Sequence, residues 1–346
     1  MLERMTSSAR PPGSMRAVVC RSHDSDAGVA LETVAAPPMI ELGVRIATRV
    51  IGVSFANRLV LDGKHQNTPP LPFIPGTEVA GVVLECAPGV TRLRPGDRVA
   101  AGTRSGGFAE EVVVPQATAY RLPDAIDFEA AVHFPTIYAT AYAALSWRAR
   151  VQPGEVVLVH GAAGGSGLAA VEIARCLGAT VIATAGSDEK LALVARHGAQ
   201  VLINHRNGPF RDAVLAATGG RGADVIYDPV GGATFDESLR CIAPDGRIIP
   251  MGFASGAIPQ IPANLALVKN ITVIGLYWGY YVGWARTLPP AGTEARVRTA
   301  FGEMFEWCAQ GRLRPLTWRT YPISEFRQAL AAIASREVMG RVALLP

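Results

Sequence analysis

The sequence predicts an α/β protein in which a doubly wound parallel sheet is inserted into a β-rich domain. Residues 15–138 contain short strand-like runs separated by turn residues. From residue 152 strands and helices alternate with a repeat of about 20 to 25 residues, which is the rhythm of a parallel sheet covered by helices. Beyond residue 285 the pattern changes to two helices and a closing strand, so we expect this tail to pack back onto the front of the chain.

The β-rich front begins at Met15. Its alternating or β-branched runs predict strands, and Pro88-Gly89 and residues 94–97 predict turns between them. The runs are RAVVC, VRIATRVIGV, EVAGVVLECA, DRVAA and AEEVVVP. Residues 1–14 show no periodicity, and we predict that they form a flexible extension.

The central part of the chain supplies six predicted strands. They are apolar, β-branched segments at residues 155–160, 180–184, 201–204, 224–227, 247–251 and 271–276. Apolar residues at helical spacing predict a helix over 167–177 that ends at Gly178. Ser187 is expected to cap the next helix, at residues 188–197.

The tail contains two predicted helices. The first is indicated by apolar residues that share one helical face, namely Val297, Phe301, Met304, Phe305 and Cys308. Ser324 is expected to cap the second helix. The final residues, RVALLP, predict a closing strand.

Composition and charge argue against several classes of protein. The 346 residues carry 33 basic and 29 acidic side chains, a formal net charge of +4, and scattered arginines instead of a nucleic-acid footprint. The apolar run at residues 271–285 is too short to cross a bilayer. Five isolated cysteines fit a reduced, cytoplasmic protein. Neither they nor the six histidines have the spacing of metal ligands, so no metal site is predicted.

The sharpest functional motif is the glycine-rich turn at residues 160–167, HGAAGGSG, which follows a predicted strand and opens a helix. Glycines let the backbone approach a pyrophosphate, which then lies at the positive end of the helix dipole. We therefore predict a dinucleotide site at Gly164 and Gly167, with Gly165 adding room. The sequence around Ser166 lacks the last glycine of a nucleophile elbow, so Ser166 is interpreted as a hydroxyl that faces phosphate.

The end of the second central strand indicates which dinucleotide binds. Sites for NAD place a carboxylate there to accept from the ribose 2′-hydroxyl, but the sequence is ATAGSDEK and no acid closes the strand. Ser187 and Lys190 could instead hold a 2′-phosphate, which favours NADP. The alternative is that Ser187 only caps a helix and that Lys190 lies in solvent.

Seven short segments spread along the chain share the pattern of one family. They are VSFAN (53–57), PFIPGTEVAG (72–81), GGFAE (106–110), GAAGGSG (161–167), INHR (203–206), YDPVGG (227–232) and GFASG (252–256). With them, the chain from Met15 to Pro346 resembles the zinc-free quinone oxidoreductase branch of the medium-chain dehydrogenase/reductase superfamily, which is related to zeta-crystallin.

The resemblance implies a GroES-like catalytic domain built from residues 15–138 and 284–346, around a Rossmann NADP-binding domain at residues 139–283. It also implies a homodimer, with NADPH in the cleft between the domains. The residues implied to surround the cofactor are Thr136 near the pyrophosphate, Lys190, His205 and Arg336 around the 2′-phosphate, and Gly252, Phe253, Tyr277 and Trp278 along the nicotinamide.

Departures from the family pattern fall on the substrate side, where Ser54, Asn57, Leu59 and His65 replace an asparagine, an acid and two tyrosines. Hydride transfer to a quinone or enone puts negative charge on the carbonyl oxygen. Ser54, Asn57 or His65 could stabilise that charge, with His65 or solvent delivering the proton. The alternatives are a hydrogen-bonded turn for Ser54 and Asn57, and a partly exposed loop histidine for His65.

We therefore expect an NADPH-dependent, zinc-independent reductase of small quinones or other conjugated carbonyls. Five aromatic residues could line an apolar pocket for the acceptor or form core and dimer edge: Tyr277, Trp278, Tyr280, Tyr281 and Trp284. One alternative is a reductase of enoyl or acryloyl-CoA thioesters, with Arg286, Arg296 and Arg298 near the CoA phosphates. The other is an NADPH-binding protein without turnover.

Overall fold

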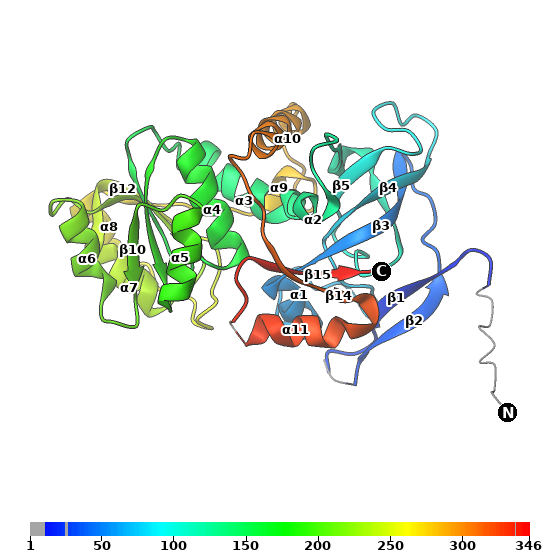
Figure 1. The fold of residues 1–346 in the computed structure, drawn as a ribbon, viewed down its shortest axis with the longest axis horizontal. Coiled ribbons are helices and arrows are strands. Elements are labelled where there is room, and N and C mark those ends of the chain that lie inside the picture. The colour runs from blue at the N-terminus through cyan, green and yellow to red at the C-terminus, as the bar shows by residue number, and fades with distance from the viewer. Residues whose placement is uncertain (1–10, 25–26, 336) are drawn as a thin grey trace.

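The computed structural model describes residues 11–24, 27–335 and 337–346, which form two domains side by side (Figure 1). One domain contains a six-stranded sheet, and the other contains a seven-stranded sheet and a separate two-stranded ribbon. Residues 1–10 of the predicted extension lie outside the described part of the chain. The first strand begins at Ser14, one residue before the predicted start.

The six-stranded sheet confirms the predicted doubly wound fold. Its strand order is β10-β9-β8-β11-β12-β13 with all pairs parallel, which is the order of a dinucleotide-binding sheet. The strands are β8 (Val156–Val159), β9 (Thr180–Ala185), β10 (Val201–Asn204), β11 (Ala223–Asp228), β12 (Ile242–Pro250) and β13 (Thr272–Val273). The edge strand β13 is shorter than predicted, and β12 begins earlier.

Alternate residues of the central strands enter two separate cores, so both faces of this sheet require helices. The helices are α4 (Gly165–Cys176), α5 (Asp188–Arg196), α6 (Phe210–Ala217), α7 (Ala233–Cys241) and α8 (Ala263–Lys269). Val157 and Val159 of β8 pack with α4, whereas Leu158 between them packs with α6 and α7. Burial on both faces is the reason that these strands are continuously apolar in the sequence.

The tail of the chain joins the sheet formed by the front. The seven-stranded sheet has the order β14-β15-β3-β4-β5-β7, and β6 pairs with β3. Strand β15 is antiparallel to β3, with Ala343 opposite Gly52. The strands are β3 (Gly43–Val53), β4 (Glu78–Cys86), β5 (Arg98–Gly102), β6 (Glu111–Pro115), β7 (Ala119–Arg121), β14 (Thr317–Pro322) and β15 (Arg341–Leu345), and the ribbon is β1 (Ser14–Cys20) with β2 (Val29–Ala35).

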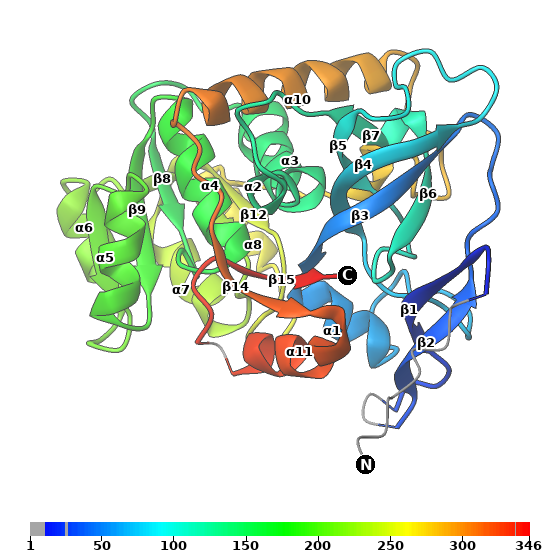
Figure 2. The same cartoon turned by 45° about the vertical axis from the view of Figure 1, so that its right-hand side comes forward.

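Six further helices accompany this sheet or connect the domains. They are α1 (Phe55–Leu61), α2 (Phe128–Ala131), α3 (Ala139–Tyr142), α9 (Trp278–Tyr281), α10 (Thr293–Ala309) and α11 (Phe326–Ala334), with π-helical turns at Phe134–Tyr138 and Ala143–Arg148. Figure 2 shows α10 extending along both domains. As predicted, its apolar face is buried: Phe301 stacks on Tyr120 with 3.4 Å between ring centroids.

The prediction for Ser324 is wrong. This residue lies inside a 3-10 turn, Ile323–Glu325, which precedes α11. An N-cap residue has an extended backbone, so Ser324, whose backbone is already helical, cannot be the N-cap. Within the described residues, no helix combines the length and the apolar character needed to span a membrane.

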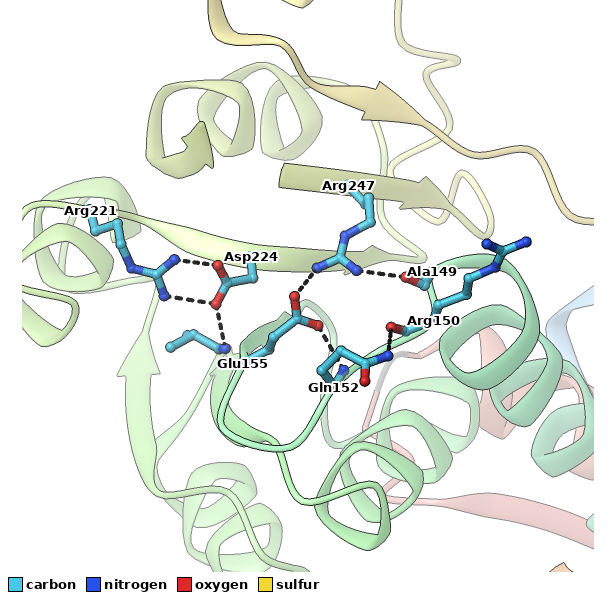
Figure 3. A network of polar contacts seen from close by, with 8 residues as sticks. Ala149, Arg150, Gln152, Glu155, Arg221, Asp224 and Arg247 are labelled. Carbon is cyan, nitrogen blue, oxygen red and sulfur yellow. Dashed lines mark hydrogen bonds and ion pairs between the residues drawn. The ribbon is translucent and has the colours of Figure 1, made fainter. Parts of the chain in front are cut away.

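A polar network fastens the amino-terminal edge of the six-stranded sheet to the segment that enters it (Figure 3). Arg247 of β12 donates to the carbonyl of Ala149 (2.6 Å) and pairs with Glu155. Asp224 of β11 accepts from the N–H of Val156 (2.7 Å). These contacts hold β8, β11 and β12 in register with the preceding segment.

Replacing Arg247 by methionine is expected to lower the free energy of unfolding by about 1–3 kcal/mol, because the carbonyl of Ala149 loses this donor and the carboxylate of Glu155 keeps only the N–H of Gln152 among the donors in the described residues. The matched control is Arg221→Met, which removes a pair with Asp224 whose arginine is 52% exposed, and which should cost at most about 1 kcal/mol. Urea denaturation followed by circular dichroism measures both. Equal shifts of the two midpoints would contradict the assignment of Arg247 as an anchor.

Candidate functional site

The candidate site lies at the carboxyl edge of the six-stranded sheet, where the turn between β8 and α4 faces the other domain. Parallel strands direct their carboxyl ends to this edge, and the helices that follow begin there. The C-terminal segment reaches the same place. Gly340 forms a parallel bridge with Gly164, and its N–H donates to the carbonyl of Ala163 (2.7 Å). The two domains therefore meet at the glycine-rich turn.

The start of α4 suits an anion. Gly164 is the N-cap and no side chain caps the helix, so the N–H groups of Gly165, Ser166 and Gly167 have no intrahelical partner. The helix dipole adds positive potential there, and a pyrophosphate fits this arrangement. Gly167 is required by the turn itself, because a Cβ at this position would lie 2.3 Å from the carbonyl oxygen of Gly161.

Gly165 makes room for a side chain, which differs from the prediction that it makes room for a ligand. A Cβ on Gly165 would lie 2.5 Å from Cγ of Arg341. Arg341 is 4% exposed and pairs with Glu78 through Nη2, while its Nη1 has no hydrogen-bond partner among the described residues. A buried guanidinium with an unused donor thus lies against the start of α4. Sequence reasoning missed this arginine, because only the fold brings residue 341 to the turn.

The predicted cofactor residue Thr136 lies beside the partner of this arginine. Its hydroxyl donates to the carboxylate of Glu78, which is fully buried on β4. Burial raises the pKa of Glu78, while Arg341 and Thr136 act in the opposite direction. The carboxylate therefore joins the π-helical turn that carries Thr136 to strand β15, and it fixes Arg341 beside the glycine-rich turn.

The side chain of Ser166 is oriented toward the sheet. Its Oγ lies 2.7 Å from the hydroxyl oxygen of Tyr227 on β11. Burial raises the pKa of Tyr227 to about 12, so both groups are neutral hydroxyls at physiological pH. The hydroxyl that we interpreted as facing phosphate is thus engaged by Tyr227, whereas the N–H of Ser166 remains directed along the helix axis toward an anion.

Cationic side chains gather at the end of β9. Ser187 Oγ accepts from the N–H of Lys190 (3.3 Å), so Ser187 caps α5, as one of the two interpretations of the sequence expected. His205 and Arg206 approach Gly186 from the end of β10. A Cβ on Gly186 would lie 3.4 Å from Nε2 of His205 and 3.5 Å from Nε of Arg206.

Mutual repulsion characterises this cationic cluster, which we define as Lys190, His205 and Arg206. Burial and Arg206 lower the pKa of Lys190, although two nearby glutamates act in the opposite direction. Burial, Arg206 and Lys190 lower the pKa of His205. A dianion among these groups would relieve their repulsion, so a 2′-phosphate fits. Arg206 was not predicted as a site residue, although it directly follows His205; the predicted Arg336 lies outside the described residues.

His160, at the end of β8, is a core residue. The hydroxyl of Ser238 donates to the carbonyl of Thr234 (2.6 Å), so Nε2 of His160 donates to Ser238 (2.8 Å) and Nδ1 accepts from Thr184 (2.9 Å). Burial lowers the pKa of His160 to about 3. The neutral ring therefore packs beneath the glycine-rich turn that follows β8 and links Thr184 with Ser238. In the described part of the chain, no group of three or more His, Cys, Asp or Glu side chains could hold a metal ion.

Ser54 and Asn57, two of the predicted donors to substrate, form a capping box at the start of α1. Oδ1 of Asn57 accepts from both the N–H (2.7 Å) and the hydroxyl (2.9 Å) of Ser54, and Asn57 is 1% exposed. The alternative interpretation, a hydrogen-bonded turn, is the arrangement observed. Because the hydroxyl proton of Ser54 is used within the cap, it is not available to a substrate oxygen in this arrangement.

His65 is the third predicted donor, in the loop after α1. Its Nδ1 accepts from the N–H of Asn67 (3.1 Å), which leaves the ring proton on Nε2. Burial lowers the pKa of His65, so the imidazole is neutral at pH 7. A neutral Nε2–H can donate one hydrogen bond to a substrate oxygen but contributes no formal charge.

The aromatic segment after β13 divides into core and surface. Trp278 is 6% exposed and donates Nε1–H to the carbonyl of Pro135 (2.9 Å). Tyr281 packs against Trp147, with 5.2 Å between ring centroids. Tyr277 is 37% exposed. Trp278 therefore belongs to the core, whereas the Tyr277 ring lies at the surface.

Gly252 and Phe253 lie just beyond β12, on the same edge of the sheet as the glycine-rich turn. Phe253 is 41% exposed, and its ring lies against Gly231, where a Cβ would be 3.1 Å from Cδ1. The other domain reaches this region through Asn67, whose Nδ2 donates to the hydroxyl of Tyr277 (2.8 Å). Both domains therefore contribute to the Asn67–Tyr277 contact.

The arginines considered for a CoA thioester are mostly engaged elsewhere. Arg298 pairs with Glu294 (3.0 Å) and donates to the carbonyl of Gln116 (2.6 Å). Arg296 lies over the ring of Trp147, with 4.2 Å between Cζ and the centroid. Arg286 is exposed. These contacts give the thioester alternative little support.

Comparison with known proteins places the chain among dehydrogenase-like enzymes. Residues 41–124 match the alcohol dehydrogenase GroES-like domain, and residues 165–291 match the zinc-binding dehydrogenase family. The chain is 38% identical over 330 residues to the quinone oxidoreductase-like protein 2 of Rattus norvegicus, covering 95% of this chain and 91% of the relative.

Two further relatives extend this similarity. The quinone oxidoreductase of Rattus norvegicus is 32% identical over 304 residues, covering 87% of this chain and 88% of that protein. The crystal structure of Escherichia coli quinone oxidoreductase complexed with NADPH is similar in fold, with a TM-score of 0.85 and 27% identity over 96% of this chain and 100% of that chain. Both domains are therefore shared with these relatives.

Proposed function

Because the chain belongs to the quinone oxidoreductase branch of the medium-chain dehydrogenase/reductase superfamily, we propose that it uses NADPH to reduce quinones or other conjugated carbonyls without zinc. The observation that carries this proposal is the cationic cluster at the end of β9. A 2′-phosphate would form charge-assisted hydrogen bonds with these groups, which a 2′-hydroxyl cannot form.

Different groups of residues suit the different parts of NADPH. The start of α4 and Nη1 of Arg341 suit the pyrophosphate, because no side chain caps this helix and Nη1 has no hydrogen-bond partner among the described residues. The cationic cluster suits the 2′-phosphate. Gly252 and Phe253 lie on the side where the nicotinamide would extend, at the carboxyl end of β12.

The bound cofactor would supply a hydride, and this chain would supply orientation and electrostatics. The acceptor gains negative charge on a carbonyl oxygen, so donors near the exposed ring of Phe253 would lower the barrier. We assign this role to the Nε2–H of His65, because Nδ1 of the same ring accepts from Asn67. Since Ser54 and Asn57 bond to each other, we assign them the role of holding α1 rather than contacting substrate.

The experiment that tests this function follows NADPH absorbance with phenanthrenequinone, menadione, an enone and acryloyl-CoA, in parallel with NADH. Oxidation of NADPH with quinones or enones is the expected result. Turnover only with acryloyl-CoA would move the activity to thioester reduction. Tight NADPH binding without any turnover would favour a binding protein, and equal use of NADH would contradict the role of the cationic cluster.

NADPH affinity is expected to increase as the pH falls from about 8 to about 6.5, by several-fold. The pKa of His205 lies below its usual value in the free protein, because burial, Arg206 and Lys190 disfavour the imidazolium. A neighbouring 2′-phosphate favours the imidazolium and raises that pKa, so binding takes up a proton. Calorimetry in two buffers of different ionisation enthalpy measures the uptake.

NADH and the variant His205→Gln are the controls for this pH dependence. NADH has no 2′-phosphate and glutamine does not titrate, so the affinity should be flat over this range in both cases. An unchanged slope in His205→Gln would assign the proton to another group. Below pH of about 6 the phosphate itself takes up a proton, and the trend should reverse.

We propose that two copies of the chain associate through the β13 edge of the six-stranded sheet. This edge strand has one neighbour, β12, within the described sheet. The adjacent α8 buries none of its residues, and its Leu267 and Val268 are 76% and 69% exposed. Paired edges would cover this apolar surface.

Analytical ultracentrifugation should give a dimer for the unsubstituted chain, and Leu267→Glu should give a monomer at micromolar concentration. A monomeric unsubstituted chain would contradict the proposal.

A further inference from the structure

The ring of Tyr277 lies against Gly279, and a side chain at residue 279 would collide with it. A Cβ on Gly279 would lie 2.3 Å from both Cζ and Oη of Tyr277, so the phenol rests on the backbone at the start of α9. Its neighbour Trp278 points into the core, whereas the Tyr277 side chain remains partly exposed beside the carboxyl edge of the sheet. The phenol is thus held against the backbone at the surface, on the carboxyl side of β13.

One hydrogen bond determines how the phenol is oriented. Asn67, from the loop after α1, donates through Nδ2 to Oη of Tyr277 (2.8 Å). An amide nitrogen can only donate, so the phenol oxygen is the acceptor in this contact. The hydroxyl proton of Tyr277 therefore has no acceptor among the described residues. A donor that is held in place and left unused is suited to a ligand oxygen.

One cationic side chain acts on the Tyr277 phenol. The guanidinium of Arg104 is exposed and close enough to act on Tyr277. Burial raises the pKa of Tyr277, while Arg104 and Asn67 act in the opposite direction, so the phenol keeps its proton at pH 7. No acidic side chain among the described residues is a cause of the shift in the pKa of Tyr277. Tyr277 therefore acts as a donor in this environment and cannot act as a base.

We propose that the hydroxyl of Tyr277 donates a hydrogen bond to the carbonyl oxygen of the acceptor as that oxygen gains negative charge, and that Asn67 and Gly279 are positioning residues. This inference rests on the proposed function. Two electrons and one proton reach the acceptor as a hydride, and the carbonyl π bond or its conjugated equivalent breaks to place the electron pair on oxygen. Solvent then supplies the second proton, so Tyr277 keeps its own.

The variant Tyr277→Phe removes the donor without changing the ring. The kcat for menadione should fall by about 10- to 100-fold, with the Kd for NADPH, measured by tryptophan fluorescence, unchanged within about twofold. Tyr321→Phe is the control, because among the described residues the one hydrogen bond of its hydroxyl is from Arg319 (3.5 Å), and the residue lies on β14. An equal kcat in Tyr277→Phe and the control would overturn the proposal.

Two positioning variants separate donation from packing. Asn67→Asp turns the amide into an acceptor that consumes the phenol proton, so it should lower kcat about as much as Tyr277→Phe. Gly279→Ala displaces the ring and should do the same. Adding Tyr277→Phe to either variant should produce no further loss, because all three act through one hydrogen bond. Fully additive losses would contradict a shared mechanism.

A binding measurement keeps this inference separate from the proposed function. 4-Nitrophenolate carries a negative oxygen on a flat ring, so it imitates the reduced acceptor, and its visible absorption reports a hydrogen bond. With NADP⁺ present, Tyr277→Phe should weaken its binding about tenfold and remove the spectral shift. If the unsubstituted enzyme reduces no acceptor, the proposed function fails while this readout still decides the role of Tyr277; binding that is the same in both proteins overturns that role.

Discussion

Replacing Gly167 by alanine is expected to abolish measurable NADPH binding and to lower the free energy of unfolding by about 3 kcal/mol. The new Cβ would lie 2.3 Å from the carbonyl oxygen of Gly161 and 2.7 Å from Cα of Ala162. Both are backbone atoms, so neither can move aside by changing rotamer. The turn must open, and the N–H groups at the start of α4 would then lose their common direction toward the pyrophosphate.

Gly302→Ala is the matched control for this substitution. Gly302 lies inside α10, and its Cβ would meet no atom within 4 Å. Alanine in an exposed helix interior stabilises by about 0.5–1 kcal/mol relative to glycine, so the sign of the effect is opposite. Differential scanning fluorimetry with and without NADPH measures stability and binding together. A Gly167→Ala protein that is shifted by NADPH as much as the original would contradict the role of the turn.

Lys190→Ala is expected to weaken NADPH binding by about 10- to 100-fold while leaving the Kd for NADH unchanged within about twofold. A charge-assisted hydrogen bond to phosphate contributes about 1.5–3 kcal/mol, which converts to this range. The loss should be confined to the 2′-phosphate, because the lysine lies in the first turn of α5, next to the ribose position at the end of β9. Fluorescence titration with both nucleotides gives the ratio of the two constants.

The control for Lys190 is Lys64→Ala. Lys64 is 72% exposed and lies in the other domain, and its loss changes the net charge by the same amount. If both variants weaken NADPH binding equally, the effect is one of overall charge, and the local assignment fails. If only Lys190→Ala loses affinity, the cationic cluster is the phosphate site.

The six-stranded sheet could be predicted because its information is local. Strands buried on both faces are continuously apolar, and glycine or serine marks where the helices start and stop, so each unit could be recognised alone. The same locality explains the capping box of Ser54 and Asn57, whose spacing is itself a helix-start pattern. Its motif was given a catalytic interpretation because it falls within a segment shared with a family of enzymes.

The remainder of the site depends on contacts between distant parts of the chain. Nothing near Gly165 in the sequence indicates that Arg341 fills the space above it, and nothing near Tyr277 indicates that Asn67 determines its orientation. Such pairs form only after both sheets and their connection exist. The prediction for Ser324 failed for a local reason, because Pro322 is the N-cap of a 3-10 turn that begins at Ile323, one residue before Ser324.

The bridge between Gly164 and Gly340 has a consequence for synthesis on the ribosome. Chains emerge amino end first, and domains fold as they become complete. The parallel sheet and its glycine-rich turn can therefore form while the segment with Gly340 and Arg341 is still inside the exit tunnel. At that stage Glu78 would lack its arginine, and the phosphate site would lack one wall. Emergence of the segment with Gly340 and Arg341 is thus the event that completes this wall of the phosphate site.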